Sequence, residues 1–225
     1  MNIALFGGTF DPVHTGHLEA AKAAAGKFQL DQVLFIPAGN PPHKPGDHFT
    51  SFPHRFAMVA LACAEDRRFV PSLLEAPTPD GRPQYSIATA RKAKTVFGPK
   101  AHLYFLIGVD AFLDLPQWKD YRRLLDLVDF IVVSRPGSAS DKIPKVVPEE
   151  LLRPSQPADQ PDTVPLKRTT LSILRGVEAP VASRDIREAI RAGQGVSGLV
   201  PPLVEQYILK AGLYAPRRGR RYLRR

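Results

Sequence analysis

The sequence predicts an α/β fold in which one parallel sheet is covered by helices on both faces. Short apolar runs of strand length alternate with longer segments whose apolar residues recur at helical spacing. Strands that are buried on both faces read as continuous apolar runs, and residues 33–37, 103–107 and 130–133 have this character. The 225 residues are enough to bury the core of one domain, and they contain no internal repeat. We therefore expect a Rossmann-like, doubly wound parallel sheet.

The individual elements follow from apolar spacing and from turn residues. The expected strands lie at residues 3–6, 33–37, 68–74, 103–107, 130–133 and 171–174. The expected helices lie at residues 16–28, 52–66, 87–96, 184–191 and 201–211. Pro71 interrupts the third strand, which should therefore be short or near an edge of the sheet. Gly212 should stop the last helix.

Residues 1–215 should form a single domain, followed by a basic C-terminal tail at residues 216–225. Within the domain, residues of about 137–168 are polar and rich in proline, which predicts a surface excursion and leaves an interface role as the alternative. Six arginines of the tail account for most of the formal charge of +9 and leave +3 for the rest. The tail reads as a solvated terminus, with RNA or an acidic partner as the alternative. A mildly basic body suits an enzyme with polyanionic substrates.

Cysteine usage and hydropathy predict a cytoplasmic protein. Cys63 is the only cysteine, which excludes a disulfide framework and indicates a reducing compartment. No apolar stretch fits a signal peptide or a membrane span. The sequence does not fix the oligomeric state, so a homo-oligomer stays open.

The segment GGTFDPVHTGH, residues 7–17, is where chemistry is expected to begin. It joins the first strand to the first helix and places His17 in the first turn of that helix. Glycines let the backbone approach a ligand closely, and the N–H groups at a helix N-terminus favour an anion such as phosphate. His14 lies three residues before His17, so both side chains can aim at one bound group. In the alternative interpretation, the two histidines are loop residues that cap the helix.

Other kinds of site fit this loop less well. It contains neither G-x-G-x-x-G nor G-x-x-x-x-G-K-[ST], so neither the dinucleotide fingerprint nor the Walker A lysine is present. A zinc site is disfavoured because Cys63 is the only cysteine and no third ligand is spaced to complete a tetrahedral set.

A second anion site is expected at VASRDIR, residues 181–187. The Ser183 hydroxyl at a helix N-cap and Arg187 one turn later would lie beside free N–H groups. Taken alone, the segment also fits a capped helix with Arg187 in a surface salt bridge. Ligands of parallel sheets bind outside the carboxyl ends of the strands, so the loops after Phe6, Ile36, Ile107 and Val133 should face one cleft.

Two segments resemble known signatures. Residues 7–17 resemble the G-G-[ST]-F-[DN]-P-x-H-x-G-H signature of the nucleotidyltransferase superfamily, and residues 181–187 resemble its I-S-S-T-x-I-R motif. Within that superfamily, residues 1 to about 214 are most similar to the bacterial nicotinate-nucleotide adenylyltransferases. This likeness is also supported, in the same order along the chain, by PPHK (41–44), YS (85–86), GVD (108–110), LPQW (115–118) and SRPG (134–137). The chain departs from the family pattern at Ala88, Lys119, Ala182 and Arg184.

The resemblance implies roles for particular residues. His14, His17 and Arg187 would hold the phosphates of ATP, and Asp110 would bind its ribose. The rest of the implied ATP site comprises Gly7, Gly8, Thr9, Phe10, Gly16, Gly108, Arg135, Ser183 and Arg184. The implied mononucleotide site comprises Lys44, Tyr85, Ser86 and Trp118, with Trp118 stacked on the pyridine ring. As alternatives, Trp118 belongs to the core and Lys44 is an ordinary solvated lysine.

The implied reaction joins nicotinate mononucleotide to the AMP part of ATP in NAD biosynthesis. A phosphate oxygen of the mononucleotide attacks the α-phosphorus, and the products are nicotinate adenine dinucleotide and pyrophosphate. A phosphate monoester is already ionised near neutral pH, so no protein nucleophile is needed. Mg²⁺ would arrive with ATP and be held by phosphates and water, so no metal ligands of the protein are expected.

Three other functions share features with this sequence. A sister transferase acting on phosphopantetheine shares the ATP half of the site, although Trp118 and residues 41–44 weigh against it. From another class, an RNA-binding protein would use the arginine-rich tail. A class I aminoacyl-tRNA synthetase shares H-x-G-H but is disfavoured, because the chain is short and has no K-M-S-K-S-like segment. The sequence does not decide between a nicotinate and a nicotinamide ring.

Overall fold

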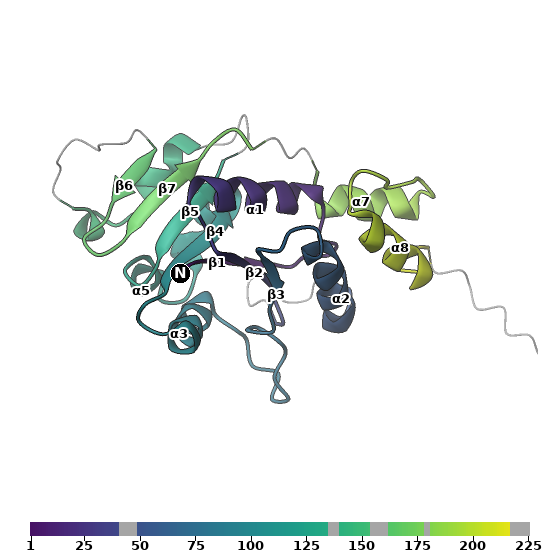
Figure 1. Cartoon of the computed structure of the whole chain (residues 1–225), viewed down its shortest axis with the longest axis horizontal. Coiled ribbons are helices and arrows are strands. Elements are labelled where there is room, and N and C mark those ends of the chain that lie inside the picture. Colours follow the sequence, from purple (N-terminus) through teal and green to yellow (C-terminus); the bar gives the residue numbers. More distant parts are fainter. Residues whose placement is uncertain (41–48, 135–139, 154–161, 178–180, 217–225) are drawn as a thin grey trace, which may run out of the picture.

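A seven-stranded sheet forms the centre of the computed structural model, which describes residues 1–40, 49–134, 140–153, 162–177 and 181–216. The strand order is β3-β2-β1-β4-β5-β7-β6 (Figure 1). The strands are β1 (Asn2–Gly8), β2 (Gln32–Pro37), β3 (Phe69–Pro71), β4 (His102–Gly108), β5 (Asp129–Val133), β6 (Thr163–Pro165) and β7 (Thr170–Leu174). Of the described strand pairs, β6 with β7 is antiparallel and the others are parallel. The predicted Rossmann-like α/β fold is confirmed.

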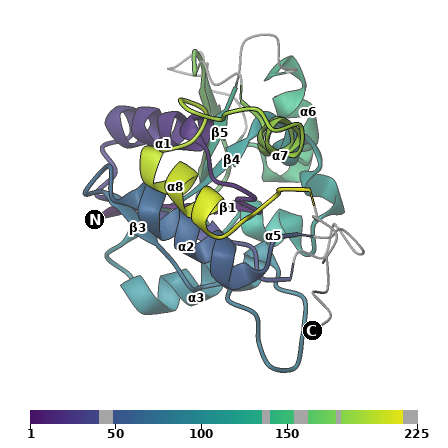
Figure 2. The ribbon, with the colours of Figure 1, turned by 90° about the vertical axis from the view of Figure 1, so that its right-hand side faces the viewer.

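Helices cover both faces of this sheet. One layer contains α1 (Thr15–Lys27) and α2 (Phe52–Cys63). The helices α7 (Ser183–Arg191) and α8 (Pro202–Lys210) lie beyond the end of the sheet and extend the same half of the core (Figure 1). The other layer contains α3 (Ser86–Phe97), α4 (Val109–Leu113), α5 (Tyr121–Leu125) and α6 (Ile143–Val146). Three short 3₁₀ turns lie next to these helices along the chain, namely η1 (Leu115–Gln117), η2 (Ser140–Lys142) and η3 (Glu149–Leu151). Figure 2 shows α8 lying along α2, so a helix near the C-terminus packs against a helix from the first half of the sequence. None of the helices in the described ranges is long and apolar enough to cross a membrane.

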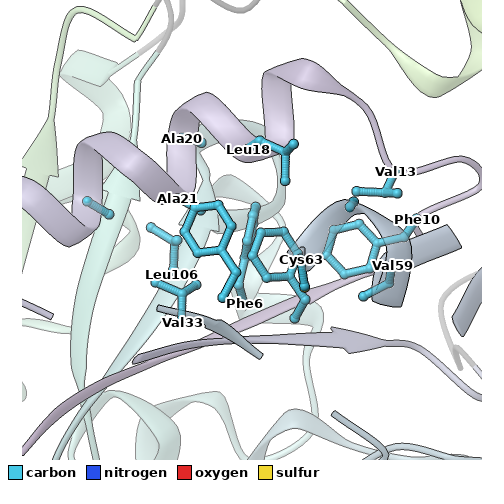
Figure 3. Close-up of a cluster of buried hydrophobic side chains, with 14 of the residues drawn as sticks. Phe6, Phe10, Val13, Leu18, Ala20, Ala21, Val33, Val59, Cys63 and Leu106 are labelled. Atoms are coloured by element: carbon cyan, nitrogen blue, oxygen red, sulfur yellow. The ribbon is translucent and has the colours of Figure 1, made fainter. Parts of the chain in front are cut away.

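Alternation along the strands divides the core into two halves. In β1, Ala4 and Phe6 point to the layer of α1 and α2, whereas Ile3 and Leu5 point to the layer of α3 and α5. Figure 3 shows the first of these halves, in which Phe6 lies between the sheet and α1, the helix that carries Leu18 and Ala21. Successive side chains of a strand face opposite sides, so a strand covered on both faces must be apolar throughout. This is why the continuous apolar runs of the sequence became the central strands.

Two features of the sheet differ from the sequence prediction. The strand β3 is short and lies at an edge, as Pro71 predicted, but the opposite edge is formed by β6, which was not predicted. The segment of residues 137–168 was expected to be a surface excursion, yet Ile143, Val147 and Leu166 are buried in the core. These apolar residues are isolated among prolines and polar residues, so the segment has no periodic signal although it packs against the sheet.

If the segment around α6 is part of the core, Ile143→Ala should lower the free energy of unfolding by about 2–4 kcal/mol, because Ile143 is fully buried. Chemical denaturation followed by circular dichroism measures this change. The matched control is Leu209→Ala, since Leu209 is 70% exposed on α8 and its loss should change stability by less than about 0.5 kcal/mol. Equal stabilities of the two variants would mean that the segment only lies on the surface.

Candidate active site

A cavity of about 450 Å³ opens at the carboxyl edge of the sheet. The parallel registers place Gly8 beside Pro37 and Gly108 beside Val133, so β1, β2, β4 and β5 all end at this edge. The segments after β1, β2 and β4 line the cavity as predicted, whereas residues 135–139 after β5 lie outside the described part of the chain. Of the residues that the sequence assigned to the site, the cavity is lined by Gly7, Gly8, Thr9, Tyr85, Ser86, Gly108 and Trp118. The cavity therefore gathers the end of β1, the start of α3 and the turn around η1.

One wall of the cavity depends on a close approach between two loops. A Cβ atom added to Gly39 would lie 2.1 Å from the backbone oxygen of Glu75, so the loop after β2 can only run here with glycine at this position. Ala38 and Glu75 both line the cavity next to this contact. The sequence marked the loop after residue 37 as a binding loop, and residues 41–48 of that loop lie outside the described part of the chain.

Trp118 forms another part of the cavity lining. Its side chain is half-buried and lines the cavity, and its ring meets Phe105 of β4 edge-on with centroids 6.1 Å apart. Trp118 thus contacts the core through Phe105 and also lines the cavity, so the two interpretations of this residue are compatible. Next to it, the Lys119 ammonium lies 4.4 Å from the centroid of the Tyr85 ring.

The two histidines meet at the start of α1. His14 is the N-cap and is buried, His17 is half-buried in the first turn, and their ring centroids are 3.7 Å apart. The Nδ1 atom of His17 accepts a hydrogen bond from the backbone N–H of His14 at 3.2 Å. A neutral imidazole with Nδ1 as acceptor carries its proton on Nε2. This hydrogen bond therefore makes Nε2 of a neutral His17 a hydrogen-bond donor, and such a donor suits an anionic ligand.

The predicted second anion segment does reach the first loop. The Ser183 hydroxyl donates to the backbone oxygen of Pro12 at 2.9 Å, and Arg187 Nη1 donates to the backbone oxygen of Asp11 at 2.6 Å. The prediction that Ser183 caps the helix is wrong, because Ala182 has the extended backbone of an N-cap and α7 begins at Ser183. Ser183 instead binds the loop, so the hydroxyl links α7 to residues 7–17.

Some predicted residues lie apart from this centre. The Phe10 ring is 2% exposed and packs against Phe6, Phe35 and the His17 ring, so it supports the loop from the core and leaves little side-chain surface for a ligand. Arg184 is exposed, with its Nε atom 3.8 Å from Asp185 and 3.9 Å from Glu188. Gly16 is buried in α1, and Asp110 is exposed in the first turn of α4 without lining the cavity. Lys44, Arg135 and residues 217–225 of the tail lie outside the described residues.

Arg55 is the residue of this site that sequence reasoning missed. Its side chain is 2% exposed, and its guanidinium donates three hydrogen bonds of 2.8 Å to backbone oxygens. Nε binds Thr50, Nη1 binds Thr9 and Nη2 binds Ala38. A signal for its burial exists, because positions 55, 58, 59 and 62 form the buried stripe of α2, and an arginine in such a stripe needs internal partners.

Asp11 supplies the opposite charge. Its carboxylate is 3% exposed and accepts hydrogen bonds from the Tyr214 hydroxyl at 2.6 Å and from the Thr50 N–H at 3.1 Å. Burial lowers the pKa of Arg55, and the charge of Asp11 opposes that shift. Burial also raises the pKa of Tyr214, and the Asp11 carboxylate adds to this effect, so the phenol stays protonated as a donor.

The fold and the site together define a class of protein. A doubly wound sheet whose first strand runs into a histidine-bearing anion loop, beside an aromatic-walled cavity, is a nucleotidyltransferase of the Rossmann-like type. More narrowly, the chain belongs to the Cytidylyltransferase-like family, whose model matches residues 5–189.

Relatives cover nearly the full length of the chain. A protein of Desulfotalea psychrophila, named a probable nicotinate-nucleotide adenylyltransferase, is 39% identical over 214 residues, which are 94% of this chain and 99% of that protein. A Solibacter usitatus protein of the same name is 39% identical over 95% of this chain and 100% of its own. The structure of Plasmodium falciparum nicotinic acid mononucleotide adenylyltransferase complexed with NaAD has a TM-score of 0.70 at 17% identity, covering 95% of this chain and 97% of that chain. At that identity the likeness shows the fold alone.

The Arg55 network predicts a large effect of a conservative substitution. Arg55→Lys keeps the charge but replaces a planar fork by one ammonium, which cannot reach three separated carbonyls. We expect the free energy of unfolding to fall by about 2–4 kcal/mol, measured by chemical denaturation. Arg67→Lys is the matched control, because Arg67 is exposed and its replacement should be nearly neutral. A neutral Arg55→Lys variant would contradict the bracing role.

Proposed function

We propose that this chain is a nicotinate-nucleotide adenylyltransferase, which transfers the AMP part of ATP to nicotinate mononucleotide and releases pyrophosphate. The observation that carries the proposal is that Gly7, Gly8 and Thr9 belong both to the histidine-bearing loop and to the lining of the 450 Å³ cavity. The loop proposed to bind phosphate is thus next to the cavity proposed to bind the ring. Two nucleotides that are to be joined must lie next to each other in this way. The likeness to full-length relatives of that name supports the choice of substrate.

In this proposal, the loop holds the ATP phosphates. At the N-terminus of α1 the N–H of Thr15 donates to Leu199 and the N–H of His17 donates to His14, so the helix contributes the positive end of its dipole. The hydrogen bond from the His14 N–H to Nδ1 of His17 places the proton of a neutral His17 on Nε2, which can donate to a phosphate. Arg187 reaches the same loop from α7 and adds a positive charge. A phosphate oxygen of the mononucleotide attacks the α-phosphorus, and the bond to the bridging oxygen of the β-phosphate breaks. The protein therefore acts by positioning two anions and by stabilising charge that grows on the leaving pyrophosphate.

The mononucleotide half would occupy the cavity. The half-buried Trp118 ring offers an apolar face for the pyridine ring. Tyr85 and Ser86 stand at the N-terminus of the 12-residue helix α3, whose N–H groups favour an anionic group of the ligand. Lys44, Asp110 and Arg135 stay in the proposal through the family resemblance, as expectations for the rims of the two subsites.

Mg²⁺ belongs to the proposal as part of the ATP substrate. Within the described ranges, no three His, Cys, Asp or Glu side chains gather in a way that could hold a metal ion. Oxygen ligands suit Mg²⁺, so the phosphate oxygens of ATP and water could hold the ion. When bound, the ion neutralises phosphate charge, and the protein groups described above orient the two substrates.

The reaction itself can be tested with purified protein, ATP and Mg²⁺. We expect pyrophosphate release with nicotinate mononucleotide, and a product with the mass of nicotinate adenine dinucleotide. Nicotinamide mononucleotide and phosphopantetheine serve as competing acceptors in the same assay. Turnover with phosphopantetheine alone would keep the ATP site and overturn the proposed acceptor, whereas no turnover with any of the three would overturn the transferase proposal.

His17→Ala should reduce kcat by about 100-fold or more and change the KM for ATP much less. The reason is that the hydrogen bond from His17 to the ATP phosphates should strengthen as negative charge grows on the leaving pyrophosphate. Steady-state kinetics over a range of ATP concentrations separates the two constants. His102→Ala is the matched control, since His102 starts β4 at the end of the sheet away from the cavity. A raised KM with unchanged kcat would show that His17 only binds ATP.

A further inference from the structure

Lys119 has a distinctive position in the cavity. Among the described residues that line it, Lys119 is the one cation, and it directly follows the proposed ring platform Trp118. We propose that the Lys119 ammonium binds the carboxylate of the nicotinate ring and so selects nicotinate over nicotinamide mononucleotide. This inference rests on the proposed function and adds a specificity-determining residue to it.

In the structure the Lys119 ammonium lies at the cavity wall, against the ring of Tyr85. Its Nζ atom lies 4.4 Å from the centroid of the Tyr85 ring, and both residues line the cavity. A cation over an exposed aromatic face is held by only about 0.5–1 kcal/mol. A carboxylate offers a stronger, charge-assisted hydrogen bond, so the ammonium can turn from the ring of Tyr85 to an anionic ligand. A carboxamide offers no charge that would compensate for leaving the aromatic face.

The other charged side chains that line the cavity are Glu75 and Asp114. Glu75 is partly buried and accepts a hydrogen bond from the Thr89 hydroxyl at 2.7 Å. Its burial raises the pKa of the Glu75 carboxyl, which lowers the cost of protonating it when an anionic ring enters. Asp114 is exposed, so water screens its charge. Neither acid therefore cancels the preference that Lys119 creates.

The two competing ligands differ at one group of nearly equal size. Selection between them depends on the difference of two affinities, which a single cation changes for the carboxylate alone. Lys119 is exposed, so the effect should be modest. We expect Lys119→Gln to lower the preference for nicotinate mononucleotide by about fivefold, with most of the change in KM.

The experiment compares kcat/KM for both mononucleotides in the wild type, Lys119→Gln, Lys119→Arg and Lys100→Gln. Lys119→Arg keeps the charge and should keep the preference. Lys100→Gln removes the same charge from an exposed residue before β4, at the far end of the sheet, and should leave the ratio unchanged. Equal losses for both mononucleotides, or an unchanged ratio in Lys119→Gln, would overturn the inference.

A binding measurement separates this inference from the proposed function. Trp118 is the only tryptophan of the chain, so its fluorescence reports directly on the cavity without ATP. Titration with each mononucleotide should give a ratio of dissociation constants that falls in Lys119→Gln and persists in Lys119→Arg. If the wild type bound both but turned over neither, the proposed reaction would fail while this ratio still decided the role of Lys119. Equal ratios in all variants would refute it.

Discussion

The arrangement at the carboxyl edge depends on the guanidinium of Arg55. Backbone oxygens that lie beyond the ends of strands lose their sheet partners, and a buried oxygen without a donor costs about 1–3 kcal/mol. Thr9, Ala38 and Thr50 lie in three different segments, and one side chain supplies a donor to each of them. The path of the loop after β1 is therefore set from α2, and not only by the glycines of the loop.

A buried charge needs a partner, and here the partner ties the end of the chain to its beginning. Asp11 opposes the charge of Arg55, and its carboxylate is held by the hydroxyl of Tyr214, 203 residues further on. Arg187 and Ser183 bind the carbonyls of Asp11 and Pro12 from α7. Removing Arg55, Asp11 or Tyr214 would leave a buried polar group of this network without its partner. The loop, α2 and the C-terminal helices should therefore lose order together.

The parts that were predictable are those with a local signal. Continuous apolar runs identified the central strands, and the start of α1 followed from the loop motif. Long-range polar contacts give no such signal, because nothing in the sequence near Arg55 specifies that its partners are backbone oxygens of three other segments. For the same reason Ser183 was assigned to a helix cap although it binds Pro12, and the buried Ile143 was hidden in a polar stretch.

The two halves of the site differ in how firmly they are built. The loop of residues 7–17 is anchored by hydrogen bonds from α2 and α7, which suits groups that must be in place before charge develops on a phosphate. The part of the cavity lined by Tyr85 and Trp118 also contains the exposed Lys119, whose ammonium makes a weak contact with the Tyr85 ring. If Lys119 binds the ring carboxylate as proposed, a substitution there should change which ring is preferred without disturbing the buried network. Selection of the acceptor can thus vary in this fold while the transfer step is preserved, because the two depend on different contacts.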